Sequence, residues 1–390
     1  MVGPRIAPLP VDRWAPGLLE GANAIVGGTL RADANVYSTI ANSPELFTAW
    51  LHLGSHLLRR STLPAREREL VILRSTALAS GVYPFTQHDR IGREVGLSPA
   101  DVQAALDGPD SSKWQTTDRQ LLLGVDELMV NNVIGDTTWQ ALCGDWTLQQ
   151  RLDLIATAAF YRLAAWMLNV CATPLDDGQG NALGETTLGP LPPWTRAGEV
   201  RIAPLPENDW PGNFLAETSQ WPRFAARPES RSAGVYATLA NHLDLFRSLG
   251  PLMAYFFDHS SLDDRDRELV IIRSCYRDRG EYPYRQHVGI GIAAGLPGST
   301  VAALGEVAPV LDDPNQATLV GLIDELHDTN TITDETWQGL SAHFSAVQVM
   351  DVVALAGFYG VVSFVLSSAG AKLEPGDICL PDDVRPKGRS

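Results

Sequence analysis

Residues 69–88 read ELVILRSTALASGVYPFTQH, and residues 268–287 read ELVIIRSCYRDRGEYPYRQH. Each segment begins with a glutamate, ends with a histidine 19 positions later, and keeps Arg-Ser and Tyr-Pro at the same places in between. Apolar residues recur at three- and four-residue steps in the first part of each segment, which predicts a helix that the glycine ends in the left-handed conformation. The Tyr-Pro pair then opens a second helix, because proline is tolerated in a first helical turn.

Each segment is therefore predicted to form a helical hairpin. The glutamate lies near the start of the first helix, and the histidine lies one turn into the second. If the two helices pack antiparallel, a carboxylate and an imidazole meet, which is an arrangement suited to proton transfer. The predicted catalytic residues are Glu268, His287, Glu69 and His88. The alternative is that each pair is a buried hydrogen-bonded contact that fixes its hairpin.

The hairpin belongs to a repeat that extends over nearly the whole chain. The opening RIAPLP at 5–10 returns at 201–206, Asp-Glu-Leu at 126–128 returns at 324–326, and Thr-Trp-Gln at 138–140 returns at 336–338. Helical periodicity dominates, and alternating strand patterns are absent. We predict an all-α fold of two tandem helical domains related by internal pseudo-symmetry, with about six or seven helices in each.

The repeat and the composition together predict the domain limits. The first helical domain spans 1–172 and the second spans 200–371. Between them, 173–199 is rich in glycine and proline, which resist helix formation and are typical of a linker that crosses the surface. The segment 372–390 is expected to be an irregular tail.

Composition narrows the class of protein. A chain of 390 residues with 45% hydrophobic residues is typical of soluble globular proteins, and its net charge of −16 argues against a broad nucleic-acid or anionic-membrane surface. The first residues lack the apolar core of a signal peptide, so we expect a cytoplasmic protein. The four cysteines form no C-x-x-C motif and indicate neither a disulfide framework nor a structural zinc site.

With these motifs, the chain resembles the carboxymuconolactone decarboxylase and alkyl hydroperoxidase D (AhpD-like) superfamily. The resemblance covers both halves, including the Arg-x-x-Pro-Leu-Pro opening, the Tyr-x-x-x-Gln-His hairpin and the Asp-Glu-Leu helix. In the peroxidase branch, the glutamate is followed by C-x-x-C-x-x-x-H. Here Gly81 with Pro84, and Gly280 with Pro283, stand at the cysteine positions. Because thiol–disulfide chemistry requires thiolates, the chain is not expected to be a thiol peroxidase.

The decarboxylase branch of the superfamily is similar in having no redox cysteine pair, and it needs no cofactor. The resemblance implies a cofactor-independent acid/base enzyme of lyase or isomerase type acting on a small carbonyl, lactone or carboxylate compound. Decarboxylation, isomerisation, cyclisation and dehydration in a natural-product or catabolic pathway all stay open. Many relatives carry a glutamate where Pro84 and Pro283 stand, so this chain departs from their pattern. The alternative is a non-catalytic binding or scaffold protein.

Single-domain members of the superfamily assemble as trimers or hexamers, so the resemblance also implies a homo-oligomer, as a dimer or trimer of tandem chains. A small-molecule substrate is the expected partner, and neither nucleic acid nor a membrane is expected.

The residues around the histidine, here called the rim, are more polar in the second hairpin. We therefore favour the second hairpin as the substrate site. The predicted substrate-binding residues of both halves are Glu281, Tyr282, Tyr284, Arg285, Tyr83, Arg273 and Arg74. Helix-start charges on a solvated face would give the same pattern. For the two arginines the alternative is an ion pair inside the chain, with Asp153 or Asp351, and for the tyrosines it is core packing with a satisfied hydroxyl.

His52 and His56 have the i, i+4 spacing of a helical metal-binding pair. No third ligand is evident nearby in the sequence, and Pro251 and Tyr255 stand at the corresponding places of the second half. We therefore predict no metal.

Overall fold

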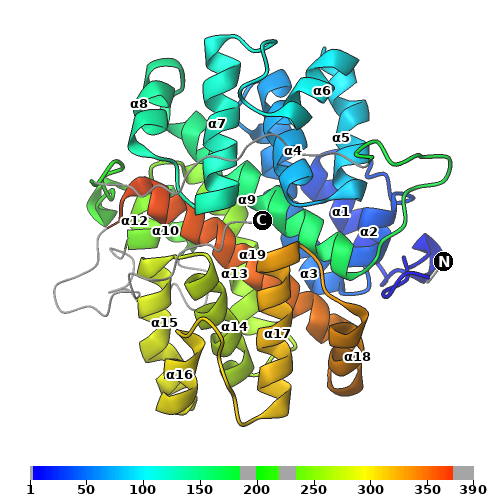
Figure 1. The fold of residues 1–390 in the computed structure, drawn as a ribbon, viewed down its shortest axis with the longest axis vertical. Coiled ribbons are helices and arrows are strands. Elements are labelled where there is room, and N and C mark those ends of the chain that lie inside the picture. Colours follow the sequence, from blue (N-terminus) through cyan, green and yellow to red (C-terminus); the bar gives the residue numbers. More distant parts are fainter. Residues whose placement is uncertain (1–2, 185–198, 219–233, 372–390) are drawn as a thin grey trace.

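The computed structural model describes residues 3–184, 199–218 and 234–371, and within these ranges it is helical without any strand (Figure 1). The all-α prediction is confirmed. The first half forms nine α-helices, α1 to α9, which exceeds the number expected because the arm before the hairpin folds into three helices of its own. The predicted tail at 372–390 and the linker residues 185–198 lie outside the described residues.

The helices of the first half are α1 (Leu18–Val26), α2 (Asn35–Ile40), α3 (Pro44–Ser55), α4 (Ala65–Leu78), α5 (Val82–Glu94), α6 (Pro99–Asp107), α7 (Thr116–Asn131), α8 (Asp136–Asp145) and α9 (Leu148–Val170). Those of the second half are α10 (Gly212–Thr218), α12 (Gly234–Leu239), α13 (Leu243–Asp258), α14 (Asp264–Arg277), α15 (Glu281–Ala293), α16 (Gly298–Leu304), α17 (Pro314–Thr329), α18 (Asp334–His343) and α19 (Ala346–Ala369). A π-helical turn at His56–Arg60 follows α3.

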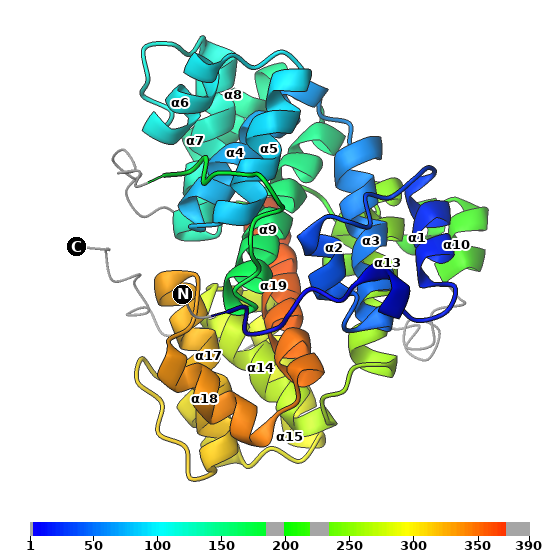
Figure 2. The ribbon, with the colours of Figure 1, turned by 90° about the vertical axis from the view of Figure 1, so that its right-hand side faces the viewer.

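The long helices α9 and α19 pack against each other at the centre of the molecule. Helices α4 to α8 lie on one side of this pair and α14 to α18 on the other (Figure 2). Helices α1 to α3 and, from the second half, α10 and α13 form a third group, in which α3 packs on α13. One continuous cluster of buried apolar side chains extends through both halves, so the halves share a core.

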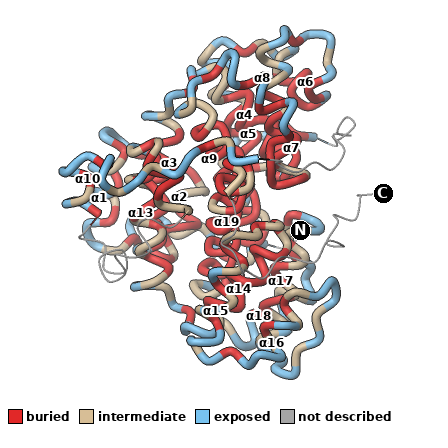
Figure 3. Tube along the Cα trace, turned by 90° about the vertical axis from the view of Figure 1, so that its left-hand side faces the viewer, coloured by how far each residue is buried: buried red, intermediate tan, exposed pale blue. Residues whose placement is uncertain are grey.

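Helix α19 is long and apolar enough to cross a membrane, with a mean hydropathy of 2.1, but 94% of its apolar window is buried inside the protein. Buried residues concentrate at the centre of the molecule, around α9 and α19 (Figure 3). Such burial is typical of the core helix of a globular protein.

The turn between α4 and α5 differs from the prediction. Ser80 takes the left-handed conformation with a φ of 53°, and Arg279 does so in the second half with a φ of 51°. Gly81 has a φ of −84°. A Cβ atom on Gly81 would lie 2.7 Å from Cβ of Ala165 and 2.9 Å from Cγ of Pro84. The glycine is therefore needed for the close approach of α9, and not for a left-handed exit.

Candidate active site

Helices α4 and α5 bring Glu69 and His88 together, as the spacing predicts. Nδ1 of His88 lies 2.5 Å from Oε2 of Glu69. The guanidinium group of Arg68 donates to the other carboxylate oxygen, Oε1, at 3.2 and 3.1 Å. Glu69 is fully buried, and both of its oxygens are occupied.

The surroundings of Glu69 favour its ionised form. Burial by itself raises the pKa of this carboxyl group, but the charges and hydrogen bonds of His88 and Arg68 outweigh burial, and the pKa lies below its usual value. A carboxylate at this place accepts a hydrogen bond from Nδ1–H of His88. The opposite ring nitrogen, Nε2, is then the atom that can exchange a proton with a ligand.

Nε2 of His88 makes no hydrogen bond with any described residue, and the ring of Tyr161 packs edge-on against the imidazole at a centroid distance of 4.8 Å. The histidine side chain keeps 7% of its surface exposed. The Glu69 carboxylate therefore orients His88 through Nδ1, and Nε2 stays without a hydrogen bond to the residues that the structure describes.

The second glutamate–histidine pair is held in the same way, but its histidine has a further hydrogen-bond partner. Nδ1 of His287 lies 2.6 Å from Oε2 of Glu268, and Arg267 donates to Oε1 of this carboxylate at 3.3 Å. Here the hydroxyl of Tyr359 lies 2.9 Å from Nε2 of His287. Both nitrogens of the second histidine are therefore engaged, so the two halves differ at the atom that would meet a substrate.

Arg74, a predicted substrate ligand, is fully buried and serves the core. Its guanidinium group binds both carboxylate oxygens of Asp126, at 2.6 and 2.8 Å. It also donates to the carbonyl oxygens of Ala105 and Leu106 at 3.1 and 2.8 Å. The side chain thus ties α4 to α7 and to the end of α6.

Arg273 repeats this arrangement in the second half. It donates to the two carboxylate oxygens of Asp324 at 2.8 and 2.7 Å and to the carbonyl oxygen of Leu304 at 3.0 Å. Both arginines therefore form ion pairs inside the chain, as the alternative interpretation predicted. The partners differ from the predicted Asp153 and Asp351, because α4 and α14 pack these side chains against α7 and α17.

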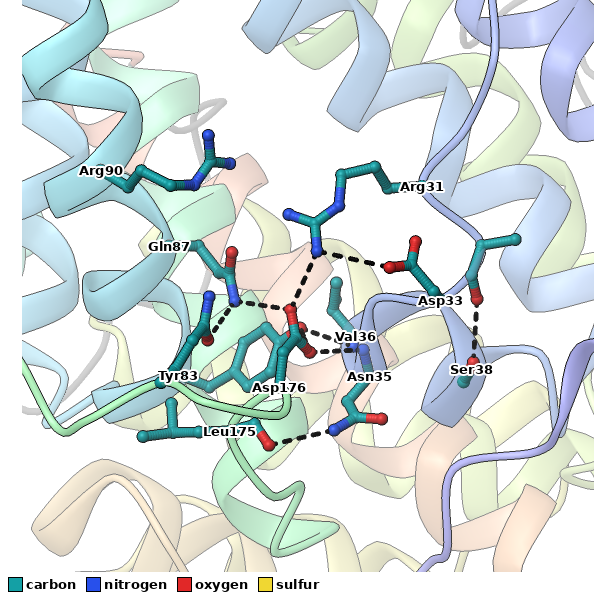
Figure 4. A network of polar contacts seen from close by, with 12 residues as sticks. Arg31, Asp33, Asn35, Val36, Ser38, Tyr83, Gln87, Arg90, Leu175 and Asp176 are labelled. Atoms are coloured by element: carbon teal, nitrogen blue, oxygen red, sulfur yellow. Dashed lines mark hydrogen bonds and ion pairs between the residues drawn. The ribbon is translucent and has the colours of Figure 1, made fainter.

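Tyr83 lies under the first part of the predicted linker (Figure 4). Its hydroxyl donates to Oδ1 of Asp176 at 2.8 Å and accepts from the backbone N–H of Val36 at 3.1 Å. The amide of Gln87 donates to Oδ2 of Asp176 at 2.9 Å. Asp176 thereby fastens residues 173–184 onto the hairpin that carries the first pair. No sequence pattern indicated this role, because Asp176 lies in a glycine-rich stretch without periodicity.

The predicted rim of the second hairpin divides into two sets. Glu281, Tyr282 and Arg285 are partly exposed, and the hydroxyl of Tyr282 accepts from a backbone N–H at the start of α12, at 2.8 Å. Tyr284 is buried and faces Tyr276, with ring centroids 6.3 Å apart. Burial raises the pKa of the Tyr284 hydroxyl, which belongs to the core and not to the rim.

A third cluster of titratable side chains lies where the two halves meet. Nε2 of His56 is 3.0 Å from Oδ1 of Asp153, and Nε2 of His242 is 3.1 Å from the same oxygen. The predicted partner of His56, His52, is not a member of this cluster. Sequence spacing missed the cluster because its residues come from the end of α3, from α9 and from the residue before α13.

Fold and site together define an all-α protein in which hairpins carry buried glutamate–histidine pairs. Residues 44–113 match the model of the Carboxymuconolactone decarboxylase family, and this segment contains Glu69 and His88. The predicted resemblance is thereby confirmed, over α3 to α6. The tandem duplication stays a prediction, which the repeated contacts of the two pairs support.

None of the curated proteins matches the chain. Among solved structures, the chain is similar to that of the debrominase Bmp8 in complex with 2,3,4-tribromopyrrole, at 15% sequence identity and a TM-score of 0.36. The similarity covers 44% of this chain and 91% of that chain. A likeness of this size carries no argument about activity.

Proposed function

We propose that the chain is a cofactor-independent acid/base enzyme for a small carbonyl, lactone or carboxylate compound, and that His88 is its proton-transfer residue. One observation carries this proposal. Nδ1 of His88 is held 2.5 Å from the buried carboxylate of Glu69, while Nε2 makes no hydrogen bond with any described residue. The match of 44–113 to the Carboxymuconolactone decarboxylase family supports an enzymatic role.

In the proposed mechanism, Glu69 accepts the Nδ1–H hydrogen bond and leaves a lone pair on Nε2 of His88. Nε2 removes a proton from the substrate, the carbonyl of the substrate takes up the electron pair, and Glu69 stabilises the imidazolium that forms. The imidazolium then protonates the product carbon. In a decarboxylation, loss of CO₂ leaves the electron pair on the conjugated carbonyl, and His88 enters the step already protonated at Nε2 and delivers that proton to carbon.

In this division of roles the glutamate holds the histidine, and the histidine itself accepts the substrate proton. Glu69 is fully buried with His88 and Arg68 on its two oxygens, so it serves as the positioning residue. We also propose that the first half is the active one, despite the more polar rim of the second. The non-catalytic alternative suits the second half, because Tyr359 occupies Nε2 of His287.

The test uses the full chain with carboxymuconolactone and a set of simple lactones and β-keto acids as probes. NMR in deuterated water reports both product formation and deuterium incorporation at carbon. General acid–base catalysis contributes about 10²–10⁴-fold, so His88→Asn is expected to reduce the rate by that factor. Glu69→Gln is expected to reduce it as well, with a changed pH profile.

The matched controls are His287→Asn and Glu268→Gln, which should lower the melting temperature and keep the turnover of the folded protein. The proposal fails if the unaltered chain neither converts any probe nor incorporates deuterium into it. It also fails if His88→Asn is as active as the unaltered chain. If His287→Asn is the inactive variant, the active site belongs to the second half.

The predicted homo-oligomer rests on the same resemblance, and we propose a dimer or trimer of chains. Sedimentation of the purified chain tests it directly, and a monomer at micromolar concentration contradicts it.

A further inference from the structure

The cluster of His56, Asp153 and His242 joins three segments of the chain at the interface between the halves. The three side chains are almost completely buried, and the rings of the two histidines lie 5.5 Å apart. One ligand atom from each residue lies within 4.8 Å of the other two. Two imidazoles and one carboxylate are a donor set that suits zinc and related divalent transition metals better than magnesium or calcium, which prefer oxygen ligands.

The distances in the cluster fit a shared cation. Bonds of about 2.0–2.1 Å in a tetrahedral site place neighbouring ligand atoms about 3.3 Å apart. Oδ1 of Asp153 lies 3.0 Å from Nε2 of His56 and 3.1 Å from Nε2 of His242. Despite that short distance, the buried Nε2 of His242 lacks the geometry of a hydrogen bond and has no other partner within 3–184, 199–218 and 234–371. A cation would give this nitrogen a partner.

The remaining oxygen of Asp153 is held in place by the protein. Oδ2 accepts hydrogen bonds from the backbone N–H of Thr62 at 2.6 Å, from its hydroxyl at 2.7 Å and from the hydroxyl of Ser61 at 3.2 Å. Such outer contacts orient a metal-binding carboxylate.

The other half provides an internal comparison. There Asp351 accepts a hydrogen bond from the hydroxyl of Tyr255 at 2.5 Å, and the hydroxyl of Ser43 lies 3.4 Å from that of Tyr255. Oδ2 of Asp351 is held by Ser261 in the way that Thr62 holds Asp153. At the corresponding junction of the other half, hydroxyl groups thus stand in place of the two histidines.

We propose that His56, Asp153 and His242 form a binding site for one divalent transition-metal ion of the zinc type, with the fourth position filled by water. This assignment departs from the sequence-based prediction of no metal, and it is independent of the proposed acid/base function. Because the ligands come from both halves, the bound ion would clamp α3 and α9 to α13 and stabilise the interface.

The test uses the full chain, stripped with a chelator and then titrated with Zn²⁺ or Co²⁺. We expect one metal ion per chain, a higher melting temperature on Zn²⁺ addition, and the visible absorption of tetrahedral Co²⁺. His242→Ser copies the serine of the other half and should keep the fold. Loss of an outer contact alone costs about 10–100-fold in metal affinity, so loss of this ligand should weaken binding by at least that factor.

The matched control is His259→Ala, which removes an exposed histidine outside the cluster and should leave metal binding unchanged. The proposal is overturned if the unaltered chain does not bind one Zn²⁺ per chain and shows no absorption of tetrahedral Co²⁺. This outcome is measured without any variant. It is also overturned if His242→Ser binds as tightly as the unaltered chain. Neither result bears on the turnover tests of His88.

Discussion

The hydroxyl of Tyr359 lies 2.9 Å from Nε2 of His287, whereas no hydrogen bond joins Tyr161 to His88 among the described contacts. The two tyrosines nonetheless pack on their histidines almost identically, with ring centroids 4.9 and 4.8 Å apart. With the same residue types, the tyrosine is thus hydrogen-bonded to Nε2 of the histidine in the second half and not in the first.

Replacing Tyr359 with phenylalanine should destabilise the protein more than the same change at Tyr161. Tyr359→Phe leaves a buried ring nitrogen of His287 without its partner, which costs about 1–3 kcal/mol. Tyr161→Phe removes no bond to His88 and should have the smaller effect. Urea unfolding of both variants measures the difference, and equal free energies of unfolding would contradict the distinction between the two sites.

The Arg74–Asp126 pair provides a second prediction. Asp126→Ala leaves a buried guanidinium group without its charge partner, and such a loss costs about 3–5 kcal/mol. The control is Asp89→Ala, which breaks the exposed i, i+4 pair with Arg93 and should cost about 0–1 kcal/mol. Thermal unfolding measures both. If Asp126→Ala instead kept its stability and lost only turnover, Arg74 would be a substrate ligand after all.

The contact between Glu69 and His88 was predictable because both residues belong to one short hairpin. Helical periodicity places the glutamate, Pro84 marks the start of the second helix, and two adjacent antiparallel helices leave few ways to pack. The all-α fold follows from the same local signals.

The partners of Arg74 and His56 were not predictable, because they depend on which helices pack together over long sequence separations. Asp126 and Asp153 are both aspartates on helices, and spacing alone does not tell which of them α4 meets. The His56 cluster depends further on the packing of α3 against α13. No local pattern encodes that contact.

Gly81 provides a third prediction. A Cβ atom there would lie 2.7 Å from Cβ of Ala165, so Gly81→Ala must push α9 away from the hairpin, and overpacking of this kind costs about 1–3 kcal/mol. The matched control is Gly21→Ala in α1, where no atom lies within 4 Å of the added Cβ. There the better helix propensity of alanine should stabilise by up to about 1 kcal/mol. Chemical denaturation distinguishes the loss of stability from the gain. An unchanged free energy of unfolding for Gly81→Ala would contradict the close approach of α9.

Asp278 links the halves through a buried ion pair. Its carboxylate oxygens accept hydrogen bonds from Arg162 at 2.8 and 3.0 Å, and Nε2 of His327 lies 3.2 Å from Oδ1. Burial by itself raises the pKa of Asp278, but Arg162 and His327 outweigh it and lower the pKa from 3.8 to about 2. The folded protein therefore holds the ionised form more strongly than the unfolded chain does.

Because the folded-state pKa of Asp278 is the lower one, this group stabilises the protein above pH 3.8 and loses its contribution as the pH falls to about 2. The shift in the pKa corresponds to about 2 kcal/mol of stability. Asp278→Asn should remove this contribution to the fall in stability at acid pH, and it should also weaken the protein at neutral pH. Urea unfolding at a series of pH values below 5 measures it. Asp328→Asn, at an exposed carboxylate paired with Arg277, should keep the slope of the unaltered protein. If Asp278→Asn keeps that slope as well, the ion pair with Arg162 does not set the acid stability.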